Sequence, residues 1–308
     1  MDRAKREYYE GLYGKPNVKM GDPDGKDWEL PDDIIPPAGA VQATADDAFF
    51  SRRDITLPVL HQGTTNTCVG QTAKVCMQDT DDFRTEEELS AMYIYYQAQR
   101  HDEWDGEGYE GTSISGACKA IRHKGNVLEK SWPNKVLDPP TDIAQLEKQA
   151  AGRKLKAYYY VHQQDSKFDS KIMNLLTTDS LLTSFRFSSH FYEIGPDGIV
   201  DEAKFEANLV PGAGHAVTII GWKMIGGKLY WEIQNSWGTG WGDNGHCYFP
   251  NDLLKKYMMR GVYYMVTQKE EQGEVPFEYK KKSRKTMFIV LGAVGGGLAL
   301  LWLLSKAF

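Results

Sequence analysis

Residues 212–250 read GAGHAVTIIGWKMIGGKLYWEIQNSWGTGWGDNGHCYFP. Two runs in this stretch, HAVTIIGWKM and KLYWEIQNSW, are rich in β-branched and aromatic residues and are joined across two glycines, a pattern typical of a β-hairpin. The hairpin would bring His215, at the start of its first strand, next to Asn235, at the end of its second. An amide oxygen on one ring nitrogen fixes the orientation and tautomer of an imidazole without adding charge. The stretch therefore predicts a sheet that holds an oriented histidine, and Trp237 could shield this pair from water.

A second informative stretch, residues 57–75, reads LPVLHQGTTNTCVGQTAKV. The spacing of its apolar residues predicts a helix that begins at Cys68. A thiol at a helix N-terminus lies at the positive end of the helix dipole, which stabilises the thiolate that attacks carbonyl groups. Gln62 precedes Cys68 across a turn, so its amide could join the Cys68 N–H in donating hydrogen bonds to an oxyanion. We therefore interpret Cys68 as a nucleophile and His215 as the base that forms a thiolate–imidazolium pair with it.

Together these residues resemble the papain family of cysteine proteases. The candidate residues occur in the order that the family has: Gln62, Cys68, His215 and Asn235. Residues 235–242, NSWGTGWG, match the family's Asn-Ser-Trp-Gly motif at every position. Residues 88–99 and 110–133 also look like the corresponding helices of bacterial-type members, so the chain is interpreted as a bacterial- or viral-type member. The resemblance covers roughly residues 52–268.

The resemblance implies hydrolysis of peptide bonds through an acyl-enzyme intermediate. In that reaction Cys68 attacks the carbonyl, and His215 protonates the leaving amine and then activates water. Gln62 and the Cys68 N–H would hold the oxyanion, while Asn235 would orient His215 under the shield of Trp237. No metal or organic cofactor is required, and the partner is a protein or peptide substrate. The motifs do not identify the residues that bind this substrate.

Some features depart from the usual pattern of the family. Residues 65–69 read TNTCV in place of Cys-Gly-Ser-Cys-Trp, so the family's common disulfide at this place cannot form. Residues 1–50 lack the long helical pattern of the usual inhibitory propeptide. The remaining cysteines lie among apolar neighbours and are interpreted as core residues: Cys76, Cys118 and Cys247.

The pattern of the chain changes near residue 155. Helical spacing comes first, within residues 68–84, 86–101 and 110–125. Short β-rich runs follow, within residues 156–163, 181–188, 215–224, 228–237 and 245–250. This order predicts an α+β protein with a papain-like fold, in which a helical lobe and an antiparallel β-rich lobe enclose a cleft.

Four parts of the chain are predicted. Residues 1–50 are rich in charge, proline and glycine and form an extended N-terminal arm, either a loose tail or a segment that lies across the domain or its cleft. Residues 51–270 form the papain-like protease domain. Residues 271–285 form a basic juxtamembrane linker, and residues 286–305 a transmembrane helix.

The membrane prediction rests on an apolar run that follows a basic one. Residues 287–304 carry no charge and would span about 27 Å as a helix, close to the thickness of a bilayer core. The cations before them would rest on anionic headgroups, which predicts that the protease domain lies on the cytoplasmic-like side. A cellular membrane and the membrane of a virus particle would need the same anchor. Gly292 and Gly296 form a GxxxG spacing through which two copies could pack as a homo-oligomer.

The net charge of −6 is unevenly distributed, because residues 280–308 contain six cations and no acid, and residues 1–279 therefore carry −12. An acidic body repels phosphate backbones, which argues against nucleic acid as a partner. Two alternatives to an active peptidase remain open. One is a papain-like scaffold without catalysis that serves binding or assembly at a membrane. The other is a thiol acyltransferase, because the same thiolate chemistry serves when an amine replaces water.

Overall fold

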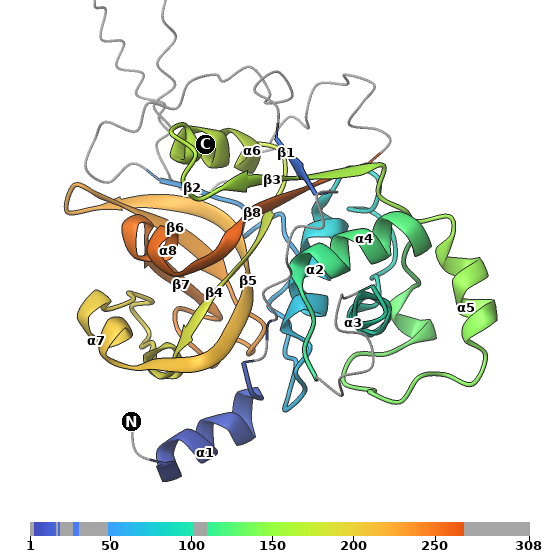
Figure 1. Cartoon of the computed structure of the whole chain (residues 1–308), viewed down its shortest axis with the longest axis horizontal. Helices are drawn as coiled ribbons and strands as arrows, with labels where there is room; N and C mark the ends of the chain where they lie inside the picture. Colours follow the sequence, from blue (N-terminus) through green and yellow to red (C-terminus); the bar gives the residue numbers. More distant parts are fainter. Residues whose placement is uncertain (1–2, 17, 19–26, 31–48, 102–109, 268–308) are drawn as a thin grey trace, which may run out of the picture. The chain divides into compact units, whose positions relative to one another are not determined.

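The computed structural model describes residues 3–16, 18, 27–30, 49–101 and 110–267 (Figure 1). They belong to one compact unit, Met1–Glu274. Within it, helices dominate the first half of the domain and strands the second, so the predicted α+β architecture with an antiparallel sheet is confirmed. The predicted linker and transmembrane helix, residues 271–285 and 286–305, lie outside the described residues. Among the residues that are described, no helix is both long enough and apolar enough to cross a bilayer.

The helical lobe is centred on three consecutive helices: α2 (Cys68–Asp79), α3 (Ala91–Gln99) and α4 (Ile114–Lys124). Serine side chains cap two of them, because Ser90 Oγ accepts the N–H of Tyr93 and Ser113 Oγ accepts the N–H of Gly116. Helix α4 ends at Gly125, whose φ of 85° favours glycine. The three helices expected from the sequence are confirmed, and each is shorter than expected because its polar ends lie in turns. The lobe also contains η1 (Glu129–Ser131) and α5 (Ile143–Ala150).

The other lobe contains an eight-stranded sheet in the described part of the chain, with the order β1-β3-β8-β4-β5-β6-β7 and with β2 paired to β5. The strands are β1 (Trp28–Glu29), β2 (Phe49–Ser51), β3 (Ala157–His162), β4 (Leu181–Ser188), β5 (Leu209–Ile225), β6 (Lys228–Gln234), β7 (His246–Pro250) and β8 (Met258–Val266). The pairings are antiparallel except for β1 with β3, which is parallel. All five predicted strands are confirmed. The sequence did not predict β8, which lies between β3 and β4.

Short helices flank this sheet: α6 (Phe168–Leu176), η2 (Ser189–Glu193), α7 (Glu202–Ala207) and α8 (Asn251–Tyr257). Its core is rich in fully buried aromatic side chains, among them Phe185, Phe191, Trp231 and Phe249. Burial of one such side chain contributes about 2–3 kcal/mol to folding. This aromatic core gives β5 and β6 a rigid support, and these two strands carry His215 and lead to Asn235.

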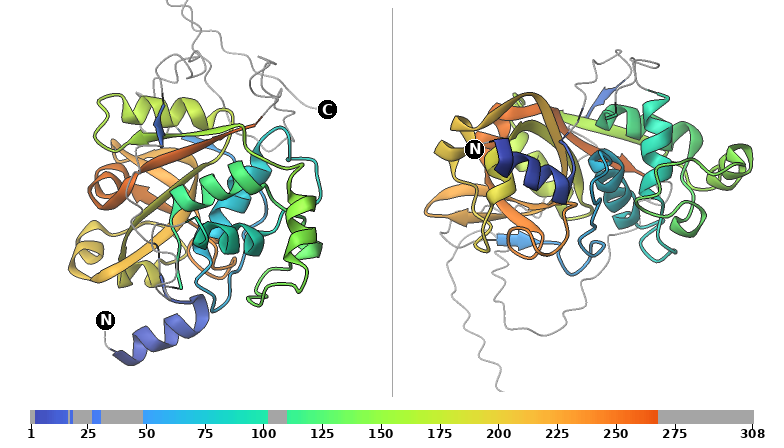
Figure 2. Two further views of the ribbon diagram at one scale, coloured as in Figure 1. Left: turned by 45° about the vertical axis from the view of Figure 1, so that its right-hand side comes forward. Right: turned by 90° about the horizontal axis from the view of Figure 1, so that it is seen from below.

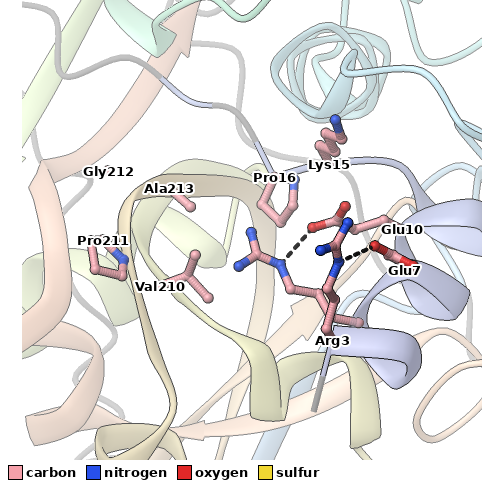
Figure 3. Close-up of a pocket in the computed structure, with 10 residues that line it drawn as sticks. Arg3, Glu7, Glu10, Lys15, Pro16, Val210, Pro211, Gly212 and Ala213 are labelled. Atoms are coloured by element: carbon pink, nitrogen blue, oxygen red, sulfur yellow. Dashed lines mark hydrogen bonds and ion pairs between the residues drawn. The ribbon is translucent and has the colours of Figure 1, made fainter. Parts of the chain in front are cut away.

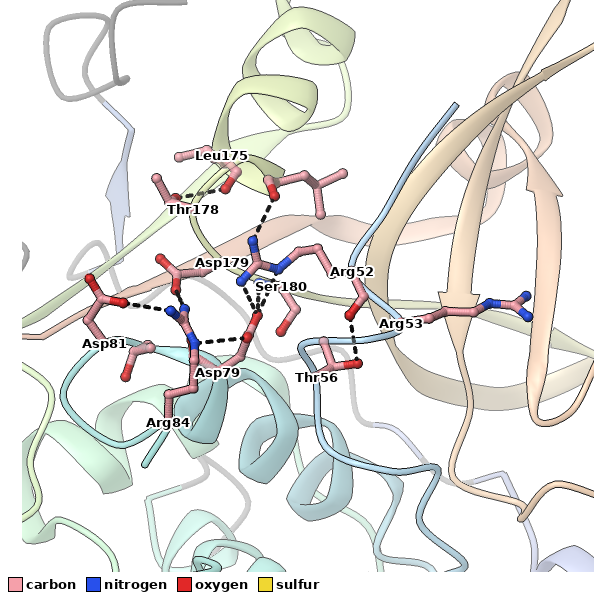
Figure 4. Close-up of polar contacts among 12 residues, drawn as sticks. Arg52, Arg53, Thr56, Asp79, Asp81, Arg84, Leu175, Thr178, Asp179 and Ser180 are labelled. Atoms are coloured by element: carbon pink, nitrogen blue, oxygen red, sulfur yellow. Dashed lines mark hydrogen bonds and ion pairs between the residues drawn. The ribbon is translucent and has the colours of Figure 1, made fainter. Parts of the chain in front are cut away.

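A buried ion pair joins the two lobes at the C-terminal end of α2 (Figure 4). Arg52 Nε donates to Asp79 Oδ2 at 2.9 Å, and Arg52 Nη1 donates to the carbonyl oxygen of Leu176 at 3.1 Å. The N–H of Ser180, just before β4, donates to the same Asp79 oxygen at 2.7 Å. Because the Asp79 side chain is 0% exposed, these contacts fix the end of α2 against the sheet and thereby the direction in which Cys68 lies.

Replacing Asp79 by alanine should destabilise the protein strongly. The change leaves the Arg52 guanidinium buried without its carboxylate, and a broken buried pair costs about 3–5 kcal/mol. Urea unfolding would measure the loss. Asp81→Ala is the matched control, because Asp81 pairs with Arg84 at the surface, with its side chain 43% exposed, and should change stability by about 0.5 kcal/mol or less. Equal effects of the two substitutions would contradict a structural role for the pair.

The N-terminal arm differs from its prediction. Residues 1–50 were expected to be extended, but Arg3–Tyr13 form the helix α1. Two ion pairs at i,i+4 spacing stabilise it, Arg3 with Glu7 and Arg6 with Glu10, each at 2.7 Å. The sequence pattern hid this helix because its contact face consists of tyrosines instead of aliphatic residues. Figure 2 shows α1 next to the junction of the two lobes.

Candidate active site

The hairpin of β5 and β6 brings His215 and Asn235 together as the sequence predicts. His215 Nε2 lies 2.8 Å from Asn235 Oδ1. The backbone N–H of Ser236 also donates to this Asn235 atom at 2.8 Å, which identifies the atom as the amide oxygen, since an N–H group can only donate. Nε2 of His215 must therefore carry the proton in this bond. The other ring nitrogen, Nδ1, is then the basic atom of the neutral imidazole.

The environment of His215 keeps it neutral at pH 7. The residue is 0% exposed, and this burial lowers its pKa to about 4 despite the opposing effect of the hydrogen bond to Asn235. Within the described residues, Nδ1 has no hydrogen-bond partner. A neutral imidazole with a basic nitrogen of this kind can accept a proton from a thiol placed next to it.

Trp237 packs over the imidazole. The ring centroids of His215 and Trp237 lie 4.7 Å apart, and Trp237 is only 2% exposed. Phe187 and Phe191 approach the indole edge-on, while Tyr13 and Tyr192 stack on it at 4.9 Å and 5.1 Å. The aromatic shell excludes water from the hydrogen bond between His215 and Asn235, which strengthens that bond.

Cys68 is the first residue of α2 and is fully buried. Further along the helix, Thr218 of β5 hydrogen-bonds the Cys76 thiol. From Cys76 back to Cys68 the helix runs about 12 Å, and from Thr218 back to His215 the strand runs about 10 Å. The helix start is tied to the same end, because the N–H of Gln62 donates to the carbonyl of Ser236. Cys68 and Ala216, the neighbour of His215 in β5, also belong to the same buried cluster.

Gln62 is held at both ends of its side chain. Its Oε1 accepts the hydroxyl of Ser236 at 2.6 Å, and its Nε2 donates to the carbonyl of Thr65 at 2.7 Å. The amide carries a second N–H, which is the group that an oxyanion could use. The neighbouring His61 side chain is exposed whereas Gln62 is 1% exposed, as expected for adjacent residues of an extended segment.

The start of α2 has no side-chain cap. Thr67 occupies the cap position without accepting a helix N–H, and its hydroxyl instead lies 2.7 Å from that of Thr65 and 3.2 Å from Gln71 Nε2. The N–H groups of a first helical turn have no partner inside the helix. The positive end of the helix dipole therefore lies at Cys68.

The other cysteines differ from a reactive thiol. Burial raises the pKa of Cys76, Cys118 and Cys247, which keeps all three protonated at pH 7. They are buried thiols, as the sequence predicts. In the described ranges of the chain, no group of three or more His, Cys, Asp or Glu side chains could hold a metal ion.

Several residues of the site were missed by the sequence analysis. Ser236 lies inside the recognised motif, yet its hydrogen bonds to Asn235 and Gln62 depend on the fold. Tyr192 and Tyr13 cover Trp237 from two distant parts of the chain. The i,i+4 spacing of Tyr9 and Tyr13 was the available signal for a helix with an aromatic face.

His246 allows a test of how burial acts on this lobe without touching the candidate catalytic groups. Burial lowers its pKa to about 4, whereas the unfolded chain takes up the proton near pH 6.5. Its contribution to stability is therefore fully present above about pH 6.5 and is lost as the pH falls toward 4. Between pH 7 and 4.5 we expect a loss of roughly 2 kcal/mol from this residue.

Urea unfolding of the parent and of His246→Gln at both pH values would check this prediction. The free energy of unfolding should fall less in the variant, by about the amount assigned to the histidine. The same fall in both proteins would mean that His246 is not responsible.

Comparison with known proteins supports the same reading. Residues 52–266 match the sequence model of the family described as "Papain family cysteine protease". A cathepsin L-like peptidase of Aedes aegypti is 24% identical over 220 residues, which is 71% of this chain and 62% of that protein, so the match spans less than two thirds of its length.

Two solved structures share the fold. Xylellain, a cysteine protease from Xylella fastidiosa, superposes with a TM-score of 0.61 at 18% identity over 84% of this chain and 97% of that one. A cysteine protease of Carica candamarcensis, in complex with E-64, superposes with a TM-score of 0.54 at 16% identity over 71% of this chain and 98% of that one.

The two-lobed fold thus carries a thiol at a helix start in one lobe and an amide-held imidazole in the other. Since the family's sequence model covers well over half of its length, this chain belongs to the papain family of cysteine proteases. The family predicted from the NSWGTGWG motif and the order of the candidate residues is thereby confirmed.

Proposed function

We propose that this chain is a cysteine peptidase that hydrolyses peptide bonds through Cys68, His215 and Asn235. The observation that carries the proposal is the assigned tautomer of His215: Nε2–H donates to Asn235, which leaves Nδ1 available as the base. The side chain of Asn235 orients the ring without a charge, so the imidazole can gain and lose a proton during the reaction.

The proposed reaction has two halves. In the first, Cys68 transfers its proton to Nδ1 of His215, and the thiolate sulfur forms a bond to the substrate carbonyl carbon. The resulting oxyanion accepts hydrogen bonds from the Cys68 N–H and the second N–H of Gln62. The C–N bond then breaks, and His215 gives its proton to the leaving amine.

In the second half, His215 takes a proton from water, and the hydroxide oxygen attacks the thioester carbon. The C–S bond breaks, the carboxylic acid product leaves, and the proton returns from His215 to the Cys68 sulfur. The chemistry uses only groups of the chain and water.

An epoxysuccinyl inhibitor of the E-64 type tests the proposal most directly. Covalent labelling of Cys68, located by mass spectrometry, is the expected result, whereas a folded protein that is never labelled would favour the scaffold without catalysis. Addition of an amine nucleophile during peptide turnover separates the second alternative, because an acyltransferase would give mainly the aminolysis product. Hydrolysis as the main reaction supports the peptidase.

We further propose that residues 286–305 anchor the protein in a bilayer as a single helix, with the protease domain on the cytoplasmic-like side and the basic residues 271–285 at the surface. The support is the sequence pattern alone: an uncharged apolar run of bilayer length behind a cluster of cations. The bacterial or viral subgroup and the pairing of two copies through Gly292 and Gly296 remain proposals of the same kind.

Flotation with anionic vesicles tests the anchor. The full chain should float with the vesicles and resist extraction by carbonate, because an inserted helix is held by its apolar surface. A chain in which Leu298 and Leu300 are replaced by aspartate is the control and should remain in the soluble fraction. Extraction of the full chain by carbonate would contradict the anchor.

A further inference from the structure

His61 places an exposed imidazole directly beside the proposed oxyanion site. The residue precedes Gln62 and forms an antiparallel β-bridge with Trp237. The N–H of Gly238 donates to the carbonyl of Leu60 at 2.9 Å, which extends this contact. A Cβ added to Gly238 would lie 2.7 Å from Cδ2 of His61, so the imidazole packs on the backbone of this glycine. The ring is thereby held at the surface, next to the indole that covers the candidate base.

The position of His61 matches the leaving half of the substrate. In the proposed reaction His215 protonates the leaving amine, so the residues that follow the cleaved bond start next to this imidazole. Trp237 packs on the imidazole at 4.7 Å, and His61 lies opposite Trp237 in the β-bridge. An extended peptide advances about 3.3 Å per residue. The first one or two residues after the cleaved bond are therefore within reach of the His61 side chain.

Lys135 approaches the same place from the helical lobe. A Cβ added to Gly63 would lie 3.5 Å from both Cδ and Cε of Lys135, so the methylene stem of the lysine lies along Gly63, the residue after Gln62. Lys135 is exposed, and its positive charge acts on the nearby ring of His61. Both side chains therefore border Gln62.

The loop that carries Lys135 is fixed by Asn134. Asn134 Oδ1 accepts Gln71 Nε2 at 2.6 Å and the N–H of Lys135 at 3.0 Å. Its Nδ2 donates to the carbonyl of His61 at 3.4 Å. Lys135 has a φ of 68°, a left-handed backbone that is uncommon for a lysine and that persists only where the surroundings hold it. The loop therefore presents Lys135 in a defined position.

The charge of Lys135 is not neutralised by the protein. Across the parts of the chain that the structure describes, no acidic side chain forms an ion pair with it. Glu129, which accepts the N–H of Asn134 at 2.7 Å, is already paired with the buried Lys74 at 3.0 Å. Residues 1–279 carry a net charge of −12, so this cation attracts anionic groups that the rest of the surface repels.

His61 adds a hydrogen-bond donor to this charge. The N–H of Gly63 donates to His61 Nδ1 at 2.9 Å, so Nδ1 carries no proton and Nε2–H is the donor of the neutral ring. Partial burial and the charge of Lys135 lower the pKa of His61, which keeps the ring neutral at pH 7. A carboxylate between the two side chains would accept from Nε2–H and pair with the ammonium group.

The cavity next to α1 offers no comparable site. It has a volume of about 510 Å³ and lies between the charged face of α1 and residues 210–213 of β5 (Figure 3). Arg3 and Arg6, which line it, pair with Glu7 and Glu10 of the same helix at 2.7 Å. These four charges already have partners, whereas the ammonium group beside Gly63 has no such carboxylate.

We infer that His61 and Lys135 bind a substrate carboxylate just after the cleaved bond, so that the enzyme prefers substrates that are acidic on the leaving side. The inference rests on the proposed peptidase function and names the class of substrate for the same site. The carboxylate has two sources with the same chemistry: the side chain of an aspartate or glutamate, and the C-terminus of the substrate. The first makes the protein an endopeptidase with an acidic preference, and the second makes it a carboxypeptidase.

Two kinds of quenched fluorescent peptide mixture test the pair. In the first, amidated peptides carry Glu or Gln at a fixed place in a randomised segment, and mass spectrometry of the products locates this residue relative to the cleaved bond. In the second, short randomised peptides end in a free carboxylate or in an amide. For the full chain, kcat/KM should be about tenfold higher for the acidic member of at least one kind, the effect of a hydrogen-bonded charge.

The variants change this ratio of acidic to neutral substrate. Lys135→Met keeps the methylene stem on Gly63 and should bring the ratio close to one, while Lys135→Glu should bring it below one because like charges repel. His61→Leu removes the donor and should lower the ratio as well. Lys130→Met is the matched control and should keep the parent ratio, because Lys130 is an exposed lysine of the same lobe that pairs with Glu87 at 2.6 Å.

The result also assigns the source of the carboxylate. A preference in the amidated peptides alone identifies an acidic side chain, and a preference in the short peptides alone identifies the C-terminus. Equal rates for acidic and neutral members of both kinds, or a preference that survives in Lys135→Met, would overturn the pair and leave the peptidase intact.

Binding separates the pair from the chemistry. Fluorescence anisotropy with the same peptides and the Cys68→Ser chain measures carboxylate recognition without turnover. If the parent cleaves no peptide but the Cys68→Ser chain binds the acidic members more tightly, the pair is supported and the proposed peptidase is overturned. Absence of both turnover and binding preference would overturn both proposals.

Discussion

Cys68→Ser is expected to lower peptide turnover by about 10⁴-fold or more, because loss of a nucleophile that acts as a unit with its base removes most of the catalysis. A hydroxyl at this position ionises far less readily than a thiol, so the helix dipole and His215 no longer generate the attacking anion. Turnover of a quenched fluorescent peptide mixture should be measured in the parent and in the variant.

Cys76→Ser is the matched control for this prediction. Cys76 lies on the same helix and is equally buried, but burial raises its pKa and keeps the thiol protonated. The control should retain turnover. Full activity of Cys68→Ser, or an equal loss in both variants, would contradict the assignment of the nucleophile.

Gln62→Glu should lower kcat by about 10²- to 10³-fold with little change in KM, the effect of removing one donor to an oxyanion. Glutamate keeps an oxygen that can accept the hydroxyl of Ser236 but has no N–H to offer, so it loses both the bond to the carbonyl of Thr65 and the proposed donor to the oxyanion. A negative charge next to the oxyanion would add to the loss.

The matched control for Gln62 is Gln71→Glu, a buried glutamine that also donates to a threonine next to the helix start. It contributes no donor to the proposed oxyanion site and should lower kcat by less than about tenfold. If the Gln62 variant shows a raised KM and an unchanged kcat, the Gln62 side chain binds the substrate and the transition state equally well. That result would contradict its role as a donor to the oxyanion.

Each lobe contributes different residues to the candidate site. The helical lobe supplies a thiol at an uncapped helix start, and the end of this helix is fixed by the buried pair of Arg52 and Asp79. The sheet supplies an imidazole held by Asn235 and covered by Trp237. Gln62 belongs to the first lobe in sequence but is hydrogen-bonded to Ser236 of the second, so it links both halves.

The elements that carry the candidate residues could be predicted from sequence because their signals are local. The β-branched and aromatic residues of β5 and β6, the two glycines between these strands and the helical spacing after Cys68 are all short-range features of the sequence. Strand β8 and the helix α1 escaped the same reasoning. The first is buried from both sides and lacks alternation, and the second derives its contact face from tyrosines that pack on distant aromatic rings.

The amino-acid sequence by itself determined the identity of the family and the order Gln62, Cys68, His215 and Asn235, because the chemistry of each residue and its place on a helix or strand depend on near neighbours. Only the tertiary structure decided the tautomer of His215, through the N–H of Ser236, and the stacking of Tyr13 on Trp237. The contact of Tyr13 with Trp237 and that of Val18 with Gly214 join the two ends of the domain. Such contacts are set by how the whole chain packs, which no local pattern records.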